Sequence, residues 1–474
     1  MAGMIEGAAS FRDPDGVCFL WRRRVFRFVR AHAATAVRNL IGSPHFQRWV
    51  SNGWVVRTWE VDLKETGIDL SEIAWEGVPA LVLEQERIPF VSYAHEWCPE
   101  MLYSAAERTL ELQLSALAEG LMLKDATPSN ILFRGNEPVF VDVLSLVRRP
   151  LGMVVWPAYA QFVRTFLLPL LLHRRRGGGV HEVFLCHRDG LEPEDAYDCL
   201  SWTERFLPAS LRYVSLPTWL GSTKAAQGSA PSRVRLEPEE RAKELAPMLI
   251  EGLRQSLRSL RPVQRQTAWS DYTSTSTYAR DATRVKEQFV RDALAGWQPH
   301  SVLDVGCNTG HYSMIAAAAG AAVVALDYDP EVVNAVFRGT SGNANSILPL
   351  VVNLAWPSPA MGWNCAETTS FLDRATGAFD AALLLAVIHH LTVTDGVPLA
   401  AVFRLLSRMV TKGAVAEYVP PDDPQFQRIV RNKEHLIPLL GQPEFEQAFS
   451  PWFFESGRVA VPGSGRVLYA LSVR

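Results

Sequence analysis

Short apolar runs alternate with helical patterns along the second part of the chain, from Ser301 onwards. The runs predict strands at residues 302–305, 322–326, 347–352, 379–388 and 414–419, with helices at 311–319 and 330–337. Near-continuous apolar strands separated by helices are typical of a parallel sheet that is covered on both faces. Two last runs, 452–455 and 466–473, flank a Gly- and Pro-rich segment and predict an antiparallel hairpin at the end of the sheet. We therefore expect a doubly wound, Rossmann-like α/β fold for residues 265–474.

The first part of the chain has a different pattern. Residues 1–215 mix strand-like and helix-like segments and are rich in aromatic residues, which predicts an α+β domain. Residues 216–264 are predicted to form a linker and a helix, because small polar residues fill 221–234 and a helical apolar pattern runs over 238–260. Pro247 lies inside that pattern, where a proline kinks or splits a helix.

Composition and charge narrow the class of protein. Of the 474 residues, 48% are hydrophobic and 20% are charged, a balance typical of a globular protein with more than one domain. The net charge of -3 gives no global attraction to nucleic acid or to an anionic membrane. The six cysteines are scattered without a C-x-x-C pair, so we expect no disulfide framework, no metal site and a reducing, cytoplasmic location. The most apolar stretch, 162–172, is too short to span a bilayer and predicts a buried helix.

A candidate ligand site follows the first predicted strand of the sheet. Gly306 and Gly310 allow a sharp turn and a close backbone approach at the start of a helix. Asp327 ends the next strand, where a carboxylate can accept hydrogen bonds from ribose hydroxyls. The dinucleotide fingerprint G-x-G-x-x-G is absent, and Asp304 at the strand end would repel a pyrophosphate but suit the ammonium group of a methionine moiety. These residues favour S-adenosylmethionine over NAD.

The run Asp304-x-Gly306-x-Asn308-x-Gly310 resembles the first motif of class I S-adenosylmethionine-dependent methyltransferases. That resemblance implies a seven-stranded sheet with a terminal antiparallel hairpin. It also implies that the motif binds the methionine end of the cofactor and that Asp327 binds the ribose. Asn353, after the third strand, takes the place of a residue near the adenine. The alternative is a Rossmann-like domain that has another ligand or is inactive.

A second motif lies around the fourth predicted strand. Phe379-Asp380 leads into Ile388-His389-His390-Leu391, and Glu417 follows at the end of the fifth strand. With Trp363-Asn364 and Glu367, this combination resembles bacterial methyltransferases of the nodulation type. His389 or His390 is a candidate general base for an acceptor that must lose a proton, because an imidazole titrates near neutrality. Glu417 is a candidate base or orienting group; the alternative for each of the three is a packing role.

The first part of the chain carries a different set of candidates. Asp125 and Asn130 have the D-x-x-x-x-N spacing of a kinase catalytic loop, and Asp142 follows a predicted strand, as a metal-binding Asp would. This stretch resembles the core of protein kinases and small-molecule phosphotransferases. It departs from them because Lys124 precedes Asp125, no glycine follows Asp142 closely and no Gly-rich loop is evident upstream. Lys64 is the candidate phosphate-binding lysine.

The sequence thus predicts a methyltransferase that uses S-adenosyl-L-methionine. The expected acceptor is an unidentified small molecule or glycan-type metabolite, without nucleic acid as a partner and without a membrane span. Two alternatives remain: a bifunctional methyltransferase and phosphotransferase, and a non-catalytic scaffold that binds the cofactor. Tyr278 is a further candidate that could cover the cofactor.

Overall fold

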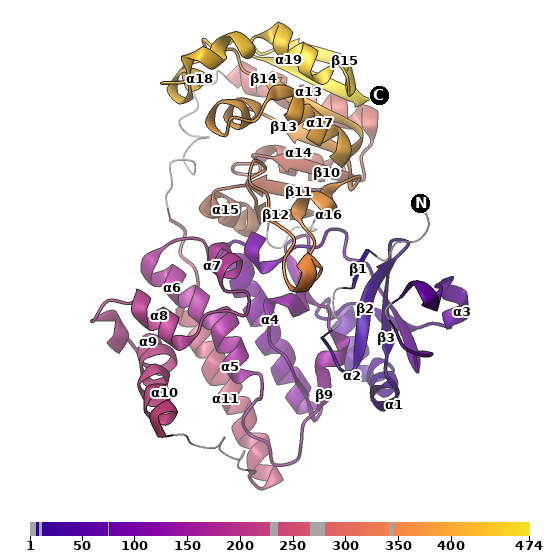
Figure 1. Cartoon of the computed structure of the whole chain (residues 1–474), viewed down its shortest axis with the longest axis vertical. Helices are drawn as coiled ribbons and strands as arrows, with labels where there is room; N and C mark the ends of the chain where they lie inside the picture. The colour runs from indigo at the N-terminus through magenta and orange to yellow at the C-terminus, as the bar shows by residue number, and fades with distance from the viewer. Residues whose placement is uncertain (1–5, 9–11, 74, 228–235, 266–279, 341–345) are drawn as a thin grey trace. The chain divides into compact units, whose positions relative to one another are not determined.

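The computed structural model describes residues 6–8, 12–73, 75–227, 236–265, 280–340 and 346–474. These residues form two compact units, which Figure 1 shows in colours that follow the chain. Unit 1 lies within Met1–Arg134, Pro138–Val263 and Ala360–Thr369, and unit 2 within Gly135–Glu137, Gln264–Pro359 and Ser370–Arg474. Tyr278 lies outside the described residues.

Unit 2 is built on a seven-stranded sheet. Its strands are β10 (Ser301–Val305), β11 (Ala322–Asp327), β12 (Ile347–Val351), β13 (Phe379–Leu384), β14 (Val410–Tyr418), β15 (Phe453–Ala460) and β16 (Val467–Val473). Their order is β12-β11-β10-β13-β14-β16-β15, and β16 runs antiparallel to both of its neighbours while the other pairs are parallel. This order confirms the predicted Rossmann-like α/β class with its terminal antiparallel hairpin.

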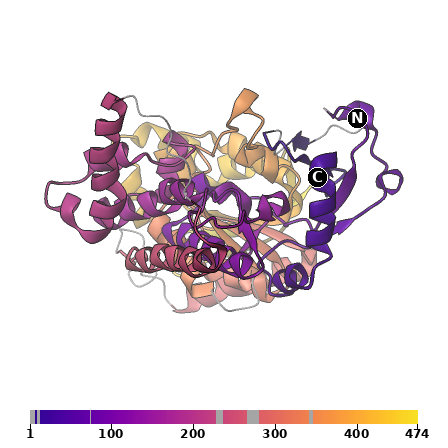
Figure 2. The same cartoon turned by 90° about the horizontal axis from the view of Figure 1, so that it is seen from below.

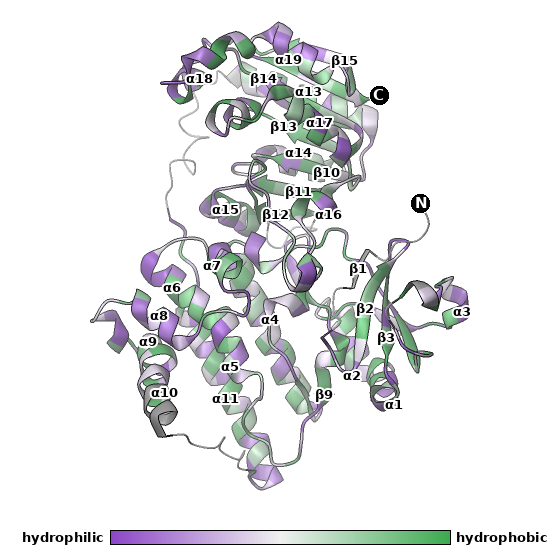
Figure 3. Cartoon of the chain, in the orientation of Figure 1, coloured by the Kyte–Doolittle hydropathy of each residue, from purple (hydrophilic) through white to green (hydrophobic). Residues whose placement is uncertain are grey.

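Helices accompany this sheet along the chain. They are α13 (Arg280–Trp297), α14 (His311–Ala318), α15 (Pro330–Thr340), α16 (Phe371–Ala375), α17 (Leu399–Met409), α18 (Pro424–Ile429) and α19 (Gln442–Phe449). Val290 and Leu294 of α13 pack into a buried core with Val302 and Val323 of the strands. The central strands are buried along most of their length and mainly hydrophobic (Figure 3), as expected for strands of a covered sheet.

One predicted boundary of this sheet was wrong. The fourth strand was expected to run over 379–388, but β13 ends at Leu384. The chain then turns through Ala386, which has a left-handed φ of 54°, into a helical turn over His390–Thr394. The apolar run misled the prediction because buried strands and buried helical turns have the same composition.

Unit 1 combines strands with a helical part. Its strands are β1 (Glu6–Ala8), β2 (Gly16–Trp21), β3 (Arg24–Val29), β4 (Thr58–Glu60), β5 (Leu81–Gln85), β6 (Leu121–Leu123), β7 (Ile131–Arg134), β8 (Glu137–Phe140) and β9 (Leu146–Arg148). The first five form an antiparallel sheet of order β1-β2-β3-β5-β4, while β6 pairs with β9 and β7 pairs with β8. In Figures 1 and 2 the five-stranded sheet lies at one end of unit 1.

The helices of unit 1 are short except for two. They are α1 (Ala31–Ile41), α2 (Pro44–Ser51), α3 (Leu63–Thr66), α4 (Pro99–Ala118), α5 (Tyr159–Phe162), α6 (Leu168–Arg176), α7 (Val180–Cys186), α8 (Pro193–Cys199), α9 (Pro208–Ser210), α10 (Leu216–Gln227) and α11 (Glu239–Ser259). A helical turn over Val163–Leu167 joins α5 to α6, so the buried helix predicted at 162–172 is present. No described helix has the length and apolar character that crossing a membrane requires.

Residues 216–264 include the helix predicted over 238–260, which is α11. The span begins with α10, and Pro247 leaves α11 unbroken. Buried residues of α11 recur at helical spacing, among them Ala246, Ile250, Leu253 and Leu257, and the helix packs against α4. This packing offsets the cost of an interior proline, which is about 3 kcal/mol.

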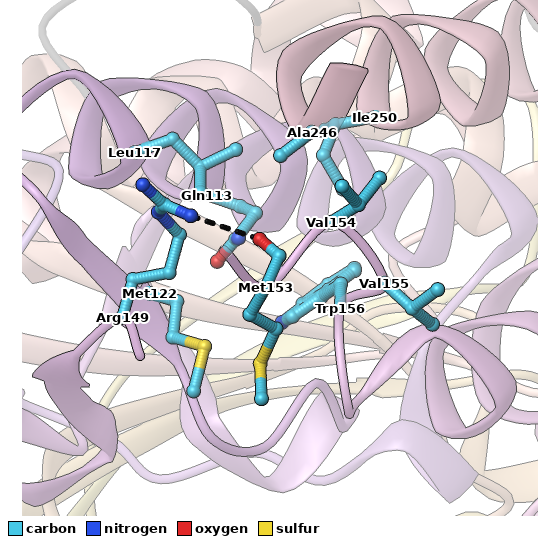
Figure 4. Close-up of a pocket in the computed structure, with 10 residues that line it drawn as sticks. All are labelled: Gln113, Leu117, Met122, Arg149, Met153, Val154, Val155, Trp156, Ala246 and Ile250. Atoms are coloured by element: carbon cyan, nitrogen blue, oxygen red, sulfur yellow. Dashed lines mark hydrogen bonds between the residues drawn. The ribbon is translucent and has the colours of Figure 1, made fainter. Parts of the chain in front are cut away.

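A small cavity in unit 1 lies where α4 and α11 meet the loop after β9 (Figure 4). Its volume is about 10 Å³, room for no more than one water molecule. Met122, Met153 and Trp156 line it with apolar surface, and Arg149 donates a hydrogen bond of 2.9 Å to the carbonyl of Met153. The cavity is too small to hold an acceptor or a nucleotide.

Candidate cofactor and acceptor site

The turn after β10 has the backbone conformation that the glycine pattern predicts. Gly306, Asn308 and Gly310 all adopt left-handed φ angles, of 70°, 46° and 78°. A Cβ atom at Gly306 would lie 3.0 Å from the side chain of Val387, and one at Gly310 would lie 3.1 Å from Val336. Both the conformation and the space therefore require glycine at these two positions.

Asp327 ends β11 beside this turn. Its carboxylate accepts hydrogen bonds from the amides of Asn308 and Asp329, each 3.1 Å long. Burial raises the pKa of Asp327 to about 6, although the two amides act in the opposite direction. The bonds hold the carboxylate against the glycine turn.

Asp304 lies in β10 and is 3% exposed. Its carboxylate accepts a hydrogen bond of 2.6 Å from the hydroxyl of Ser313 on α14. Burial raises the pKa of Asp304 to about 6, and the nearby Asp327 adds to this effect. Among the ion pairs of the described residues, none involves Asp304 or Asp327. The buried Asp304 and the partly buried Asp327 thus have no counter-charge among the described residues.

Asn353 follows β12 at the same edge of the sheet. The amide of the preceding Val352 donates to the carbonyl of Asp327 (2.9 Å), which joins the ends of β11 and β12. The side-chain oxygen of Asn353 accepts a bond of 2.9 Å from the amide of Ala355, so this oxygen stabilises a local turn. That bond leaves the amide nitrogen of Asn353, and one lone pair of its oxygen, for other partners.

The two histidines follow β13 in the helical turn rather than in the strand. His389 is 6% exposed, stacks on Phe426 with ring centroids 6.1 Å apart and lies 4.3 Å from the ring of His390. Burial lowers the pKa of His389 well below its usual value, with further contributions from His390 and Arg466. Burial also lowers the pKa of the more accessible His390. Nδ1 of His389 has no hydrogen-bond partner among the described residues.

Glu417 lies near the end of β14 in a buried charge network. One oxygen accepts from Nζ of Lys286 at 2.6 Å and from Arg466 at 3.2 Å. Arg466 also binds both oxygens of Asp423, at 2.7 and 3.0 Å. Desolvation lowers the pKa of Lys286, and Glu417 opposes this shift. The second oxygen of Glu417 is buried without a partner among the described residues.

The sequence analysis missed Lys286, Asp423 and Arg466. A signal for the first was present, because Ala282, Lys286, Val290 and Leu294 lie on one buried face of α13 at spacings of four residues. A lysine inside such an apolar stripe requires a buried partner. Arg466 and Asp423 gave no comparable signal, since each stands in a loop.

The kinase-like positions of unit 1 occupy the elements that the resemblance implies. Asp125 and Asn130 lie in the segment between β6 and β7, and Asp142 follows β8. Lys64 lies in α3, and its role in phosphate binding stays a prediction; the cation that contacts Asp142 is Arg27 of β3, at 2.7 Å. No group of three or more His, Cys, Asp and Glu side chains suited to a metal ion occurs among the described residues.

The remaining residues of the nodulation-type resemblance, Trp363, Asn364 and Glu367, lie in the stretch that unit 1 takes from the second part of the chain. Glu367 forms ion pairs with Arg12 and Arg188. These three residues are thus not part of the unit that carries the glycine turn.

Comparison with known proteins identifies the family to which the chain belongs. The family model described as a methyltransferase domain matches residues 278–451. The nodulation protein NoeA of Rhizobium meliloti (strain 1021) is 30% identical over 469 residues, which cover 98% of this chain and 95% of that protein. The O-antigen chain terminator bifunctional methyltransferase/kinase WbdD of Escherichia coli is 29% identical over 154 residues, which cover 31% of this chain and 20% of that protein.

Solved structures are also similar to part of the chain. The N-methyltransferase NodS from Bradyrhizobium japonicum WM9 in complex with S-adenosyl-L-homocysteine is 14% identical with a TM-score of 0.31, over 42% of this chain and 90% of that one. Magnesium protoporphyrin IX methyltransferase from Synechocystis PCC 6803 with bound S-adenosylmethionine is 16% identical with a TM-score of 0.29, over 44% of this chain and 86% of that one.

Proposed function

This chain belongs to the methyltransferase family of the nodulation protein NoeA and uses S-adenosylmethionine, and we propose that unit 2 transfers the methyl group to a small-molecule or glycan-type acceptor. The observation that carries this proposal is the buried Asp304 and the partly buried Asp327 beside a turn in which Gly306 and Gly310 have left-handed φ angles. Such a site suits a ligand that carries a cation next to a ribose.

We assign the cofactor to the ends of β10, β11 and β12. Asp304 lies where an ammonium group would supply the missing counter-charge, and Asp327 is oriented by two amides to accept from ribose hydroxyls. Gly306 and Gly310 let the backbone approach the ligand, and Asn308 completes the turn between them. Asn353 is left to contact the adenine through its amide nitrogen.

S-adenosylmethionine supplies a methyl group on a sulfonium centre, which makes the chemical step a displacement governed by alignment and exclusion of water. His389 is our candidate for the base that takes the acceptor proton on Nδ1, because its lowered pKa keeps the imidazole neutral and able to accept. His390, which is more accessible, is the second candidate. Glu417 is better suited to orient groups than to remove a proton, since two cations already share one of its oxygens.

Calorimetry with S-adenosyl-L-homocysteine tests the cofactor site. Gly306→Ala and Asp327→Asn are each expected to weaken binding at least about tenfold, the first by blocking the backbone approach and the second by removing a charged acceptor. Gly320→Ala is the matched control for the first, because Gly320 also has a positive φ but has open space around it. Asp373→Asn, at an exposed helix start, is the control for the second. Equal affinity in the test and control variants would remove the assignment.

The acceptor can then be sought with a radiolabelled methyl donor. Extracts from the source organism are incubated with the full chain, and label is followed into small molecules and glycans. Label that appears only in protein or nucleic acid would contradict the proposed acceptor class. His389→Asn serves as the comparison that should lose most of the transfer while keeping cofactor affinity.

A further inference from the structure

Two cations of unit 1 stand at its kinase-like centre, and both are already paired. Nζ of Lys124 donates to one oxygen of Asp13 at 2.9 Å and to one oxygen of Asp15 at 2.6 Å. All three side chains are at most about a quarter exposed. Arg27 is almost fully buried and donates to Asp142 at 2.7 Å.

The ion pairs of Lys124 join two segments that lie far apart in the sequence. Lys124 directly precedes Asp125 in the segment between β6 and β7, whereas Asp13 and Asp15 lie in the segment between β1 and β2. In kinases a Gly-rich loop covers the nucleotide phosphates, and a lysine of the third strand binds them. Here the corresponding loop carries two carboxylates, and β3 carries Arg27.

The charge balance of this centre opposes a phosphate ligand. Four carboxylates, those of Asp13, Asp15, Asp125 and Asp142, share Lys124 and Arg27, and the exposed His32 also contacts Asp15 at 2.9 Å. Burial raises the pKa of Asp125, and the other three carboxylates add to the shift while Lys124 opposes it. In kinases the Asp at this position holds the Mg²⁺ that neutralises the phosphates. Here Asp142 is paired with Arg27, and no group suited to a metal ion occurs among the described residues, so a triphosphate would meet these carboxylates without that ion.

We propose that the pairing of Asp13 and Asp15 with Lys124 closes the kinase-like centre of unit 1 from within, so that this centre does not admit a nucleotide and unit 1 is not a phosphotransferase. The segment before β2 is then held closed on the catalytic-loop segment by the chain itself. This inference concerns unit 1 alone and does not depend on the function proposed for unit 2.

Titration calorimetry of the full chain with Mg²⁺-ATP tests the proposal. Saturating S-adenosyl-L-homocysteine is present throughout, which blocks nucleoside binding in unit 2. The wild-type chain is expected to show no binding at millimolar nucleotide. Asp13→Asn/Asp15→Asn, which removes the two carboxylates that pair with Lys124, is expected to bind at least about tenfold more tightly.

The matched control is Asp62→Asn/Asp69→Asn. These carboxylates belong to the same unit and accept backbone N–H bonds at the starts of two short helices, away from Lys124. The control must behave as the wild type. Binding by the wild-type chain, or no gain in the Asp13/Asp15 variant relative to the control, overturns the proposal.

A second measurement leaves Asp13 and Asp15 unchanged. Lysines of the full chain, labelled with ¹³C at Cε, are titrated by NMR, with the signal of Lys124 assigned by its loss in Lys124→Arg. Two carboxylates that hydrogen-bond Lys124 raise its pKa despite its burial, so its signal should titrate above those of exposed lysines. Titration together with the exposed lysines would show that the carboxylates do not occupy it and would overturn the proposal.

Discussion

Replacing Lys286 by methionine is expected to destabilise unit 2 strongly. The substitution keeps the apolar stem of the side chain but leaves one oxygen of the buried Glu417 with only Arg466, at 3.2 Å. Removing one partner of a buried ion pair costs about 3–5 kcal/mol, because the remaining charge stays desolvated. Because Arg466 still pairs with Glu417, we expect the free energy of unfolding to fall by an amount near the lower end of this range, about 3 kcal/mol.

A double-mutant cycle separates the ion pair from packing. Glu417→Gln alone leaves Lys286 and Arg466 facing each other in a buried site and should also be destabilising. The variant that carries both changes should lose less stability than the two single variants added together, with a coupling energy of about 2 kcal/mol. Arg458→Met is the control, because Arg458 pairs with Glu446 on the surface of the same unit and should change stability by less than about 1 kcal/mol.

Differential scanning calorimetry of the full chain provides the assay. The transition of unit 2 is identified as the one that S-adenosyl-L-homocysteine shifts upward, since a ligand stabilises the unit that binds it. In a unit of about this size, 1 kcal/mol moves Tm by about 2–4 °C, so Lys286→Met should lower the transition by roughly 6–12 °C. An additive cycle, or a Lys286→Met shift no larger than that of Arg458→Met, would refute the reasoning.

Three further outcomes follow from other parts of unit 2. Affinity for S-adenosyl-L-homocysteine should fall as pH drops below about 6, because Asp304 and Asp327 have a raised pKa of about 6 in the free protein and a bound ammonium would lower it. Below that pH binding must expel protons, so calorimetry should show the affinity falling about tenfold per pH unit for each carboxylate. Gly413→Ala should destabilise by about 1–3 kcal/mol in thermal unfolding, because its Cβ would lie 2.4 Å from the carbonyl of Leu471, whereas Gly296→Ala, with nothing within 4 Å, should not. Replacing His389 by asparagine should lower kcat by about 10²–10⁴ for an acceptor found in the screen while cofactor affinity stays within about twofold; an unchanged kcat would exclude it as the base.

The sheet of unit 2 was predictable because its pattern is strong. Buried parallel strands read as continuous apolar runs, and each run from Ser301 onwards corresponds to a strand. The glycine turn was predictable for a related reason, since left-handed φ angles at Gly306 and Gly310 restrict the residue type. The cofactor residues in that turn remain predictions, as do the roles of the two histidines.

Other features depend on contacts between distant segments, and the local sequence did not predict them. Arg27 is the second of two arginines in β3, and nothing local distinguishes it from Arg24, which pairs with Glu84. Lys64 was predicted as the phosphate-binding lysine from its residue type alone. The unbroken α11 shows the same limit, because tertiary packing against α4 offsets the local cost of Pro247.

The position of β16 between β14 and β15 has a consequence for biosynthesis. During translation β14 and β15 emerge first, and neither can pair with β16 until the residues from Arg466 onwards leave the ribosome. Until then β14 presents an unpaired, apolar edge of the kind that recruits other chains. We therefore expect nascent or C-terminally truncated chains to depend on chaperones and to aggregate, whereas chains released in full length bury that edge in a single closing step.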